Sequence, residues 1–311
     1  MRSLINIFHQ ELDLLIHKMI TFTKLGKFGR LGNQLFQYAA LKSISLKTGF
    51  DIKIPEYASL EWHGQECLLK HFNIKADFLT NEDYKKIKYL IKEADHSKFY
   101  KSIFNIPDNS DLCGYFQNYQ YFSSCEKQIR EEFTLKSEFQ QAASEYLENM
   151  KKQIGDKEIV SVHMRRGDNT DGTNKEYANF YGSGDTLSKN SEFGKYLYKS
   201  LKIFKNKDVA FLIFSGGSRK GDNHNKKDIE WCKDNFFGEN VYYCEGNKDI
   251  VDFEIMRQCD HNITCHMTSF GWWAAFLNDN PKKIVVAPKN YTIPDDGRVD
   301  QGFYPPDWRI I

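Results

Sequence analysis

The sequence lacks the features of several large protein classes. No apolar run approaches the roughly 20 residues that a membrane-spanning helix needs. The 43 Lys and Arg residues against 42 Asp and Glu residues leave a formal net charge of +1, which argues against a general binder of nucleic acid or of anionic membranes. We therefore expect no nucleic-acid partner and at most peripheral membrane contact, and any anion site must be local.

Cysteine spacing and the amino terminus argue against two further classes. The seven cysteines are odd in number, scattered and without a C-x-x-C pair, so neither a disulfide framework nor a zinc site is suggested. Glu11 and Asp13 interrupt the apolar core that a secretory signal would need. We expect reduced thiols and a cytoplasmic protein. Because Met19 opens the first convincing strand, residues 1–18 are predicted as an N-terminal extension, either helical or read from an early start codon.

Residues 159–168 join a buried strand to a highly charged end. The run Ile-Val-Ser-Val is typical of a strand in a parallel sheet, and His163, Met164, Arg165, Arg166, Gly167 and Asp168 follow it. Open α/β sheets bind ligands at the carboxyl ends of their strands, and arginine forks fit phosphate oxygens. This favours a phosphorylated ligand. The alternatives are a surface ion pair between Arg166 and Asp168, or an adhesion tripeptide, which should instead sit on an exposed loop.

A glycine-rich segment, residues 26–33, lies between a predicted strand at 19–25 and a predicted helix at 34–47 that Gly49 should end. Such a loop can bring backbone N–H groups and a helix amino terminus to an anion. Alternatively, the glycines only permit a tight turn. The segment lacks the G-x-G-x-x-G spacing of dinucleotide-binding proteins, which makes a dehydrogenase a poor candidate.

A third polar turn follows a strand near residue 262 and precedes a helix at 269–277. Thr268 or Ser269 would either cap this helix or offer a hydroxyl and free N–H groups to a phosphate. Further strands are predicted at 50–55, 209–214, 241–243 and 283–288, and further helices at 123–152, 193–204 and 249–259, whereas 56–110 looks irregular. The alternation predicts an α/β chain with two Rossmann-like domains facing each other across a cleft, divided as 1–18, 19–155 and 156–311.

The three loops together resemble the signature of the α-1,2-fucosyltransferases, glycosyltransferase family 11. The matching segments are 29–34, His163-x-Arg165-Arg166-Gly167-Asp168, and 269–275. The resemblance implies a GT-B architecture, in which residues 19–155 form the acceptor-side domain and residues 156–311 form the GDP-sugar-binding domain. It further implies GDP-fucose as donor substrate, no cofactor and no metal. It also implies transfer, with inversion, to the 2-hydroxyl of a galactose-terminated glycan or glycolipid.

The resemblance also implies which residues bind the donor. Arg30 and Asn33 would approach it, and Arg165 would bind the pyrophosphate. The full predicted donor-binding set is Arg30, Gly32, Asn33, His163, Arg165, Arg166, Ser215, Thr268, Ser269 and Phe270. The sequence departs from the family pattern where Ser215-Gly216-Gly217 replaces a common Ser-Asp-Asp, and where His266-Met267-Thr268-Ser269 replaces an Asn-Ser-Thr turn.

Three residues are predicted to be catalytic. Arg165 would offset the charge that builds on the leaving diphosphate. Asp168 would be the base for the acceptor hydroxyl, or alternatively a brace for a neighbouring arginine. His163 would orient the arginine or bind phosphate, or would simply be a satisfied histidine at a strand end.

Other polar and aromatic residues remain open at this stage. Asp252 and Glu254 could bind ribose or interact with a helix dipole. Trp272 and Trp273 fit a helix core better than a sugar platform, and the aromatic residues at 115–122 fit either role. Rival functions are a GT-B transferase with another acceptor position or nucleotide sugar, and an inactive nucleotide-sugar-binding protein.

Overall fold

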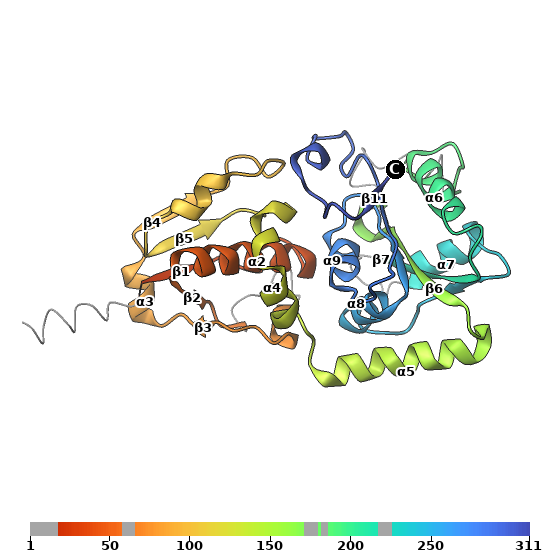
Figure 1. The fold of residues 1–311 in the computed structure, drawn as a ribbon, viewed down its shortest axis with the longest axis horizontal. Helices are drawn as coiled ribbons and strands as arrows, with labels where there is room; N and C mark the ends of the chain where they lie inside the picture. Colours follow the sequence, from red (N-terminus) through yellow and green to blue (C-terminus); the bar gives the residue numbers. More distant parts are fainter. Residues whose placement is uncertain (1–17, 58–65, 171–179, 182–185, 217–225) are drawn as a thin grey trace, which may run out of the picture. The chain divides into compact units, whose positions relative to one another are not determined.

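The computed structural model describes residues 18–57, 66–170, 180–181, 186–216 and 226–311 (Figure 1). All but the last residue of the predicted N-terminal extension therefore lies outside the described residues. The chain divides into two compact units. The first consists of Met1–Lys70 and Ile74–Glu132, and the second of His71–Asn73 and Phe133–Ile311.

The first unit is built on a five-stranded parallel sheet with the order β3-β2-β1-β5-β4. Its strands are β1 (Met19–Thr21), β2 (Asp51–Ile54), β3 (Asp77–Phe78), β4 (Tyr89–Lys92) and β5 (Ser110–Cys113). Its α-helices are α2 (Leu31–Thr48), α3 (Asn81–Lys86) and α4 (Glu126–Glu132), with 3-10 turns η2 (Leu68–His71), η3 (Lys101–Asn105), η4 (Tyr119–Tyr121) and η5 (Ser123–Cys125). Because β1 lies between β2 and β5, the loops that follow β1 and β5 meet at one edge of the sheet.

The second unit contains a six-stranded parallel sheet with the order β11-β10-β9-β6-β7-β8. Its strands are β6 (Glu158–Arg165), β7 (Val209–Gly216), β8 (Val241–Tyr243), β9 (His261–Ile263), β10 (Val285–Ala287) and β11 (Arg309–Ile310). Its helices are α5 (Ser137–Ile154), α6 (Glu192–Lys202), α7 (Lys226–Asn235), α8 (Asp249–Gln258) and α9 (Ser269–Leu277), with 3-10 turns η6 (Gly167–Asn169) and η8 (Val299–Gln301). If β6 to β11 are numbered 1 to 6 in chain order, the sheet read from β8 to β11 has the order 3-2-1-4-5-6, which is the Rossmann order.

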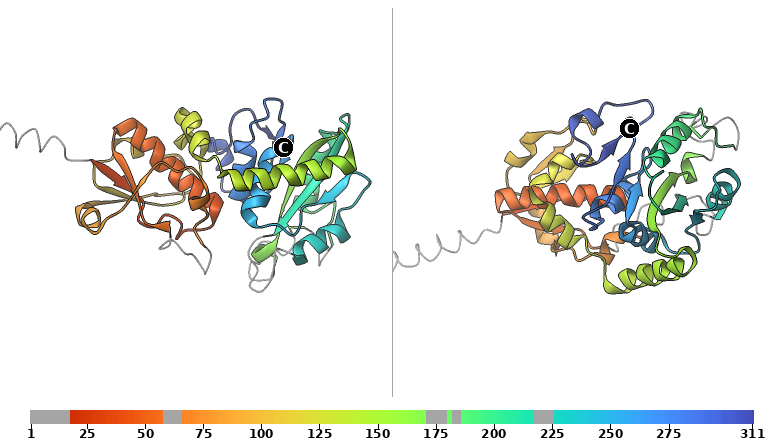
Figure 2. Two further views of the ribbon diagram at one scale, coloured as in Figure 1. Left: turned by 90° about the horizontal axis from the view of Figure 1, so that it is seen from below. Right: turned by 45° about the vertical axis from the view of Figure 1, so that its right-hand side comes forward.

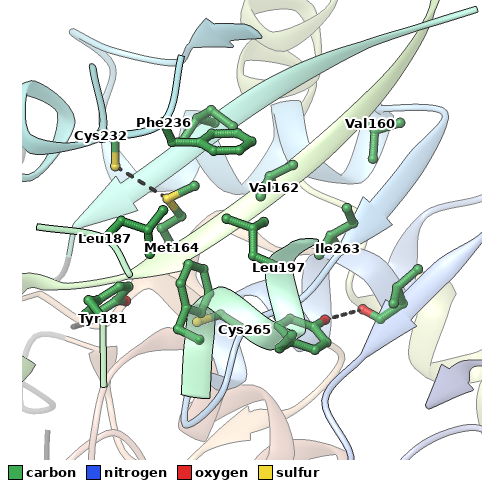
Figure 3. Packing of buried hydrophobic residues seen from close by; sticks show 14 of the residues in the cluster. Val160, Val162, Met164, Tyr181, Leu187, Leu197, Cys232, Phe236, Ile263 and Cys265 are labelled. Carbon is green, nitrogen blue, oxygen red and sulfur yellow. Dashed lines mark hydrogen bonds between the residues drawn. The ribbon is translucent and has the colours of Figure 1, made fainter. Parts of the chain in front are cut away.

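Helices cover both faces of this second sheet. On one face, α6 and α7 pack on a core to which β6 contributes Val160, Val162 and Met164 (Figure 3). On the other face, α5 packs on α8, and α8 packs on α9 (Figure 2). Alternate residues of a strand point to opposite faces, so the intervening residues of β6 lie on the α8 and α9 side.

The predicted α/β class with two Rossmann-like domains is confirmed, and so is the helix that Gly49 ends. Gly49 has φ 74°, and its N–H donates to the Ser45 carbonyl oxygen at 2.8 Å. The segment 56–110 was expected to be irregular but contains β3, α3 and β4. Both strands are short edge strands with exposed side chains, so they carry little of the apolar pattern that marks a buried strand.

The division between the units differs from the boundary expected at residue 155. The polar helix predicted at 123–152 is interrupted between α4 and α5, and the chain enters the second unit at Phe133. Phe133 packs edge-on against Trp273, with 5.2 Å between the ring centroids. The apolar face of α5 is therefore buried within the second unit, although α5 precedes the first strand of that unit.

We expect a cavity in the second core to destabilise the protein. Leu197 on α6 is fully buried, so Leu197→Ala should lower the free energy of unfolding by about 2–5 kcal/mol. Leu46 on α2 is 48% exposed, and Leu46→Ala should change it by no more than about 0.5 kcal/mol. Urea titration followed by circular dichroism measures both. Equal losses in the two variants would contradict this description of the core.

Candidate functional site

The predicted site residues of the second unit gather where the strand order reverses. β6 pairs with β7 on one side and with β9 on the other. The next α-helix is α6 after β6 and α9 after β9, and these two helices lie on opposite faces of the sheet. In open α/β sheets this reversal opens a crevice at the carboxyl ends of the strands, where ligands bind. β6 ends at Arg165, and Arg166 and Gly167 come directly after it. Residues 264–270 follow β9, and Ser215 is the penultimate residue of β7.

His163 points toward the first turn of α9. A Cβ atom placed on Gly271 would lie 2.5 Å from Nδ1 of His163, and the ring centroids of His163 and Phe270 are 6.0 Å apart. The imidazole is 6% exposed, and its Nδ1 has no hydrogen-bond partner among the described residues. Burial and the nearby charge of Arg165 lower the pKa of His163 to about 3, so the ring is neutral at physiological pH.

Arg165 ties three strands together. Its Nη1 donates to the Gly216 carbonyl oxygen at 2.7 Å, and its backbone N–H donates to Sγ of Cys265 at 3.4 Å. Its carbonyl oxygen accepts a hydrogen bond from the Tyr181 hydroxyl. These contacts join the ends of β6 and β7 to the segment after β9. The half-buried Arg165 side chain is therefore already held in place before a ligand binds.

Arg166 turns to the opposite face of the sheet, against α7. Its Nε lies 3.3 Å from Oδ1 of Asp228, and its guanidinium lies 3.6 Å from the centroid of the Trp231 ring. Asp228 also accepts the backbone N–H of Gly167 at 3.1 Å. Arg166 and Asp228 are 7% and 1% exposed, so this is a buried, hydrogen-bonded ion pair.

The sequence analysis offered Asp168 as a possible brace for a neighbouring arginine, and this expectation stays a prediction. The partner found for Arg166 is Asp228, whereas the side chain of Asp168 lies outside what the structure describes. Tyr181, Asp228 and Trp231 all escaped the sequence analysis. Tyr181 lies in a segment without periodicity, and an acidic residue in the first turn of a helix normally indicates only a favourable helix dipole.

The amino terminus of α9 faces the same edge of the sheet. Thr268 occupies the N-cap position, and within the described chain its side chain makes no capping hydrogen bond. Met267 before it adopts φ 50°, and its N–H donates to the Tyr291 carbonyl oxygen at 2.9 Å. Ser269 and Phe270 form the half-buried first turn, in which no residue is acidic. A helix end of this kind favours an anion.

The hydroxyl of Ser215 already donates a hydrogen bond within the protein, which limits the hydrogen bonds it can make to a ligand. Its Oγ donates to the Met164 carbonyl oxygen at 2.9 Å. A hydroxyl has a single proton to donate, so toward a ligand Ser215 can act only as an acceptor. This favours contact with a donor group such as a sugar hydroxyl over contact with a phosphate oxygen.

The remaining predicted donor contacts lie in the first unit, where α2 begins after β1. Arg30 holds the N-cap position of α2, and Gly32 lies in the first turn. Gly29 has φ 83°, and a Cβ there would come within 1.8 Å of the Asn33 amide nitrogen, so a larger residue cannot replace it in this turn. Asn33 Oδ1 in turn accepts a hydrogen bond from Nε2 of Gln117 at 2.5 Å.

The two acidic residues on α8 have different environments. Glu254 is fully buried and accepts two hydrogen bonds from Arg257, at 2.7 and 2.8 Å, so its carboxylate is a structural partner. Asp252 Oδ1 instead receives hydrogen bonds from Sγ of Cys244 at 3.2 Å and from the amide of Asn247 at 3.1 Å. Desolvation raises the pKa of Asp252 to about 7.

Three expectations concern the tryptophans, a metal and the membrane. Trp272 and Trp273 are fully buried, which confirms their placement in a helix core. Within the described ranges, no three His, Cys, Asp or Glu residues are grouped as metal ligands; independence from metal stays a prediction. In the same ranges, every helix is too short or too polar to cross a bilayer.

The fold is of the GT-B type found in glycosyltransferases. Among solved structures, the chain is similar to the fucosyltransferase NodZ from Bradyrhizobium, with a TM-score of 0.50 at 11% sequence identity, over 83% of this chain and 92% of that one. That likeness establishes the fold. The model of glycosyl transferase family 11 matches residues 4–311, so the chain belongs to glycosyl transferase family 11.

The curated relatives are distant but cover most of the chain. An alpha-1,2-colitosyltransferase of Escherichia coli is 26% identical over 84% of this chain and 89% of its own length. The O-antigen biosynthesis glycosyltransferase WbnK of Escherichia coli is 25% identical over 85% and 92%. Galactoside alpha-(1,2)-fucosyltransferase 1 of Rattus norvegicus is 26% identical over 86% of this chain and 65% of its own length.

The contact between His163 and Gly271 predicts that an alanine cannot replace this glycine. Alanine is the better helix former, yet Gly271→Ala should lower the free energy of unfolding by about 1–3 kcal/mol, because its Cβ would overlap the buried imidazole. Gly238→Ala, in an exposed loop, is a control for a glycine with room for a methyl group, since its Cβ would meet only Val241 at 3.5 Å. Thermal unfolding compares the two variants, and a stabilised Gly271→Ala would refute the contact.

The raised pKa of Asp252 predicts a pH-dependent stability. The usual pKa is 3.8, so between about pH 4 and pH 7 the unfolded chain releases a proton that the folded chain keeps. This carboxyl therefore makes the wild type less stable as the pH rises through that range. The unfolding temperature of Asp252→Asn relative to wild type should rise from pH 4 to pH 7 and then level off. Asp234→Asn, on the exposed surface of α7, is the control substitution.

Proposed function

We propose that this chain transfers L-fucose from GDP-β-L-fucose to the 2-hydroxyl of a terminal galactose in a surface glycan, with inversion and without a required metal. The observation that carries the proposal is the edge formed by β6 and α9. There the anchored Arg165 lies beside His163 and the start of α9. Among the described residues, the buried Nδ1 of His163 has no hydrogen-bond partner and the Thr268 side chain makes no capping hydrogen bond. The names of the family relatives support the 1,2 linkage and the galactoside acceptor.

The proposed transfer requires that the negative charge on the leaving diphosphate be stabilised. The bond between the anomeric carbon and the diphosphate oxygen breaks while negative charge builds on the departing GDP. A guanidinium held in place by the β7 carboxyl end can meet that charge without reorganising. The positive end of α9 acts in the same direction. Arg165, Thr268, Ser269 and Phe270 are therefore proposed as diphosphate contacts.

His163 contributes as a neutral group. An imidazole whose pKa is lowered to about 3 is a weak base at physiological pH, so it does not accept the acceptor proton. It can donate one hydrogen bond and accept another. We propose that it holds a diphosphate or sugar oxygen and that its neutrality leaves Arg165 as the principal cation.

The acceptor hydroxyl needs a base on the far face of the fucose. Its oxygen forms the new bond to the anomeric carbon, and its proton passes to a carboxylate. Asp168 is proposed for this role. Support comes from Arg166, whose guanidinium already pairs with Asp228, so an aspartate in the same loop is not required as its brace. We accordingly propose Arg166 as a buried support of the loop; Arg30, Gly32, Asn33 and Ser215 remain proposed donor contacts.

A second candidate donor is suggested by one relative. The Escherichia coli alpha-1,2-colitosyltransferase is 26% identical to this chain, and colitose is a fucose without its 3-hydroxyl. The same diphosphate contacts would serve either sugar. The discriminating contact is a hydrogen bond to the 3-hydroxyl, since a site built to bind a hydroxyl rejects the analogue without it.

The cytoplasmic location and the absence of a cofactor stay predictions.

The first test is GDP release from GDP-fucose in EDTA, with and without lactose. We expect release that depends on lactose and persists in EDTA. Arg165→Ala should lower kcat by about 10²–10³-fold, because it removes a donor aimed at developing charge. Arg309→Ala, on the exposed end of β11, should match the wild type.

Each outcome separates the candidates. Release only with a colitose donor would select the second candidate. GDP binding that depends on Arg165, without turnover of any donor, would favour an inactive nucleotide-sugar-binding protein. Activity that vanishes in EDTA and returns with Mg²⁺ or Mn²⁺ would contradict metal independence, and linkage analysis of the product by NMR decides the acceptor position.

A further inference from the structure

The aromatic residues that follow β5 differ in exposure, and Tyr119 among them is half-buried. Phe116, Tyr121 and Phe122 are at most 1% exposed and belong to the core of the first unit. Tyr115 is 37% exposed. The sequence left open whether this cluster is a core or a sugar platform; the structure buries Phe116, Tyr121 and Phe122 and leaves Tyr115 exposed.

A strained turn sets this division. Phe116 adopts φ 52°, which is unusual for a bulky residue, and its ring packs edge-on against Phe22, with 6.0 Å between the centroids. The Glu93 carboxylate accepts the N–H of Tyr115 at 2.7 Å and that of Phe116 at 3.0 Å. Glu93 therefore holds the turn that buries one ring and presents the next. The backbone that carries the exposed Tyr115 ring is therefore held in place by Glu93.

Two further rings lie beside Tyr115. Phe28, in the loop after β1, has its centroid 6.2 Å from that of Tyr115, and His96, in the loop after β4, has its centroid 6.3 Å away. Phe28 is half-buried and His96 is exposed. Because β1, β5 and β4 are neighbours in one parallel sheet, three consecutive carboxyl-end loops each contribute one ring.

This group of rings is fixed to the glycine-rich loop. The buried amide of Gln37 donates from Nε2 to the carbonyl oxygens of Phe28 and Gly114, both at 3.2 Å. Its Oε1 accepts the N–H of Gly26 at 3.3 Å. The rings thus stand on the same rigid edge as Arg30, which is proposed to contact the donor.

We propose that Phe28, His96 and Tyr115 form a platform that binds a pyranose ring of the acceptor glycan; this inference rests on the proposed function. On one face of galactose, several C–H bonds point the same way, and they match the negative face of an aromatic ring. The Lys24 ammonium, 5.6 Å from the centroid of Phe28, places a hydrogen-bond donor for sugar hydroxyls at the rim. Single exposed aromatics are ordinary, so the proposal rests on the grouping of three rings that come from separate loops.

The test is a set of single variants assayed for transfer from GDP-fucose to lactose. Tyr115→Ala should raise the KM for lactose about five- to tenfold and leave the KM for GDP-fucose near its wild-type value, because only the acceptor stacks on the ring. Tyr115→Phe keeps the ring and should restore the wild-type KM for lactose. Tyr89→Ala removes a tyrosine that is 47% exposed on β4, outside the platform, and should change neither constant.

The outcomes separate this proposal from the proposed function. If the wild type transfers fucose and Tyr115→Ala leaves the KM for lactose unchanged, the platform is refuted and the function stands. A rise confined to the KM for GDP-fucose would mean that the rings stack on the guanine instead, which also overturns the platform. If the wild type transfers no fucose to any galactoside, the proposed function fails first. Saturation-transfer NMR with lactose then tests the platform alone, and equal signals from wild type and Tyr115→Ala would reject it.

Discussion

The candidate site depends on the alternation of side chains along β6. A strand sends successive residues to opposite faces, so the same short run builds a core and a ligand edge at once. Val160, Val162 and Met164 fill the core beneath α6 and α7, whereas His163 faces α9. The two adjacent arginines separate for the same reason. Arg165 crosses to the end of β7, and Arg166 is sealed against Trp231 on α7.

Much of this architecture could be predicted because its signals are local. β7 is a nearly continuous apolar run and β6 contains the apolar, β-branched segment Ile159–Val162, while Gly49 ends α2 where a left-handed residue is required. The short edge strands β3 and β4 gave no comparable signal, since their side chains are exposed and their pairing is set by the rest of the sheet. The position of α5 was equally hidden, because only its packing on α8 assigns it to the second unit.

The site was predictable as a set of loops but not as a set of contacts. Sequence spacing brought His163, Arg165 and Thr268 to one edge, as expected for strands that end beside a change in order. It could not show that Asp228, some 60 residues further along, pairs with Arg166, or that Tyr181 holds the Arg165 carbonyl. Such partners are chosen by tertiary packing, and an isolated aspartate or tyrosine in a polar segment has no pattern that marks it.

The cysteines of this chain have a practical consequence. All seven are free; six are buried, and Cys113 is half-buried. Burial raises the pKa of each of the six buried thiols, which keeps them from forming the reactive thiolate. A cysteine introduced on an exposed helix would therefore react with a maleimide dye far faster than these native thiols. With Cys113 replaced by serine, one such label on each unit would let fluorescence energy transfer follow the distance between the units during catalysis.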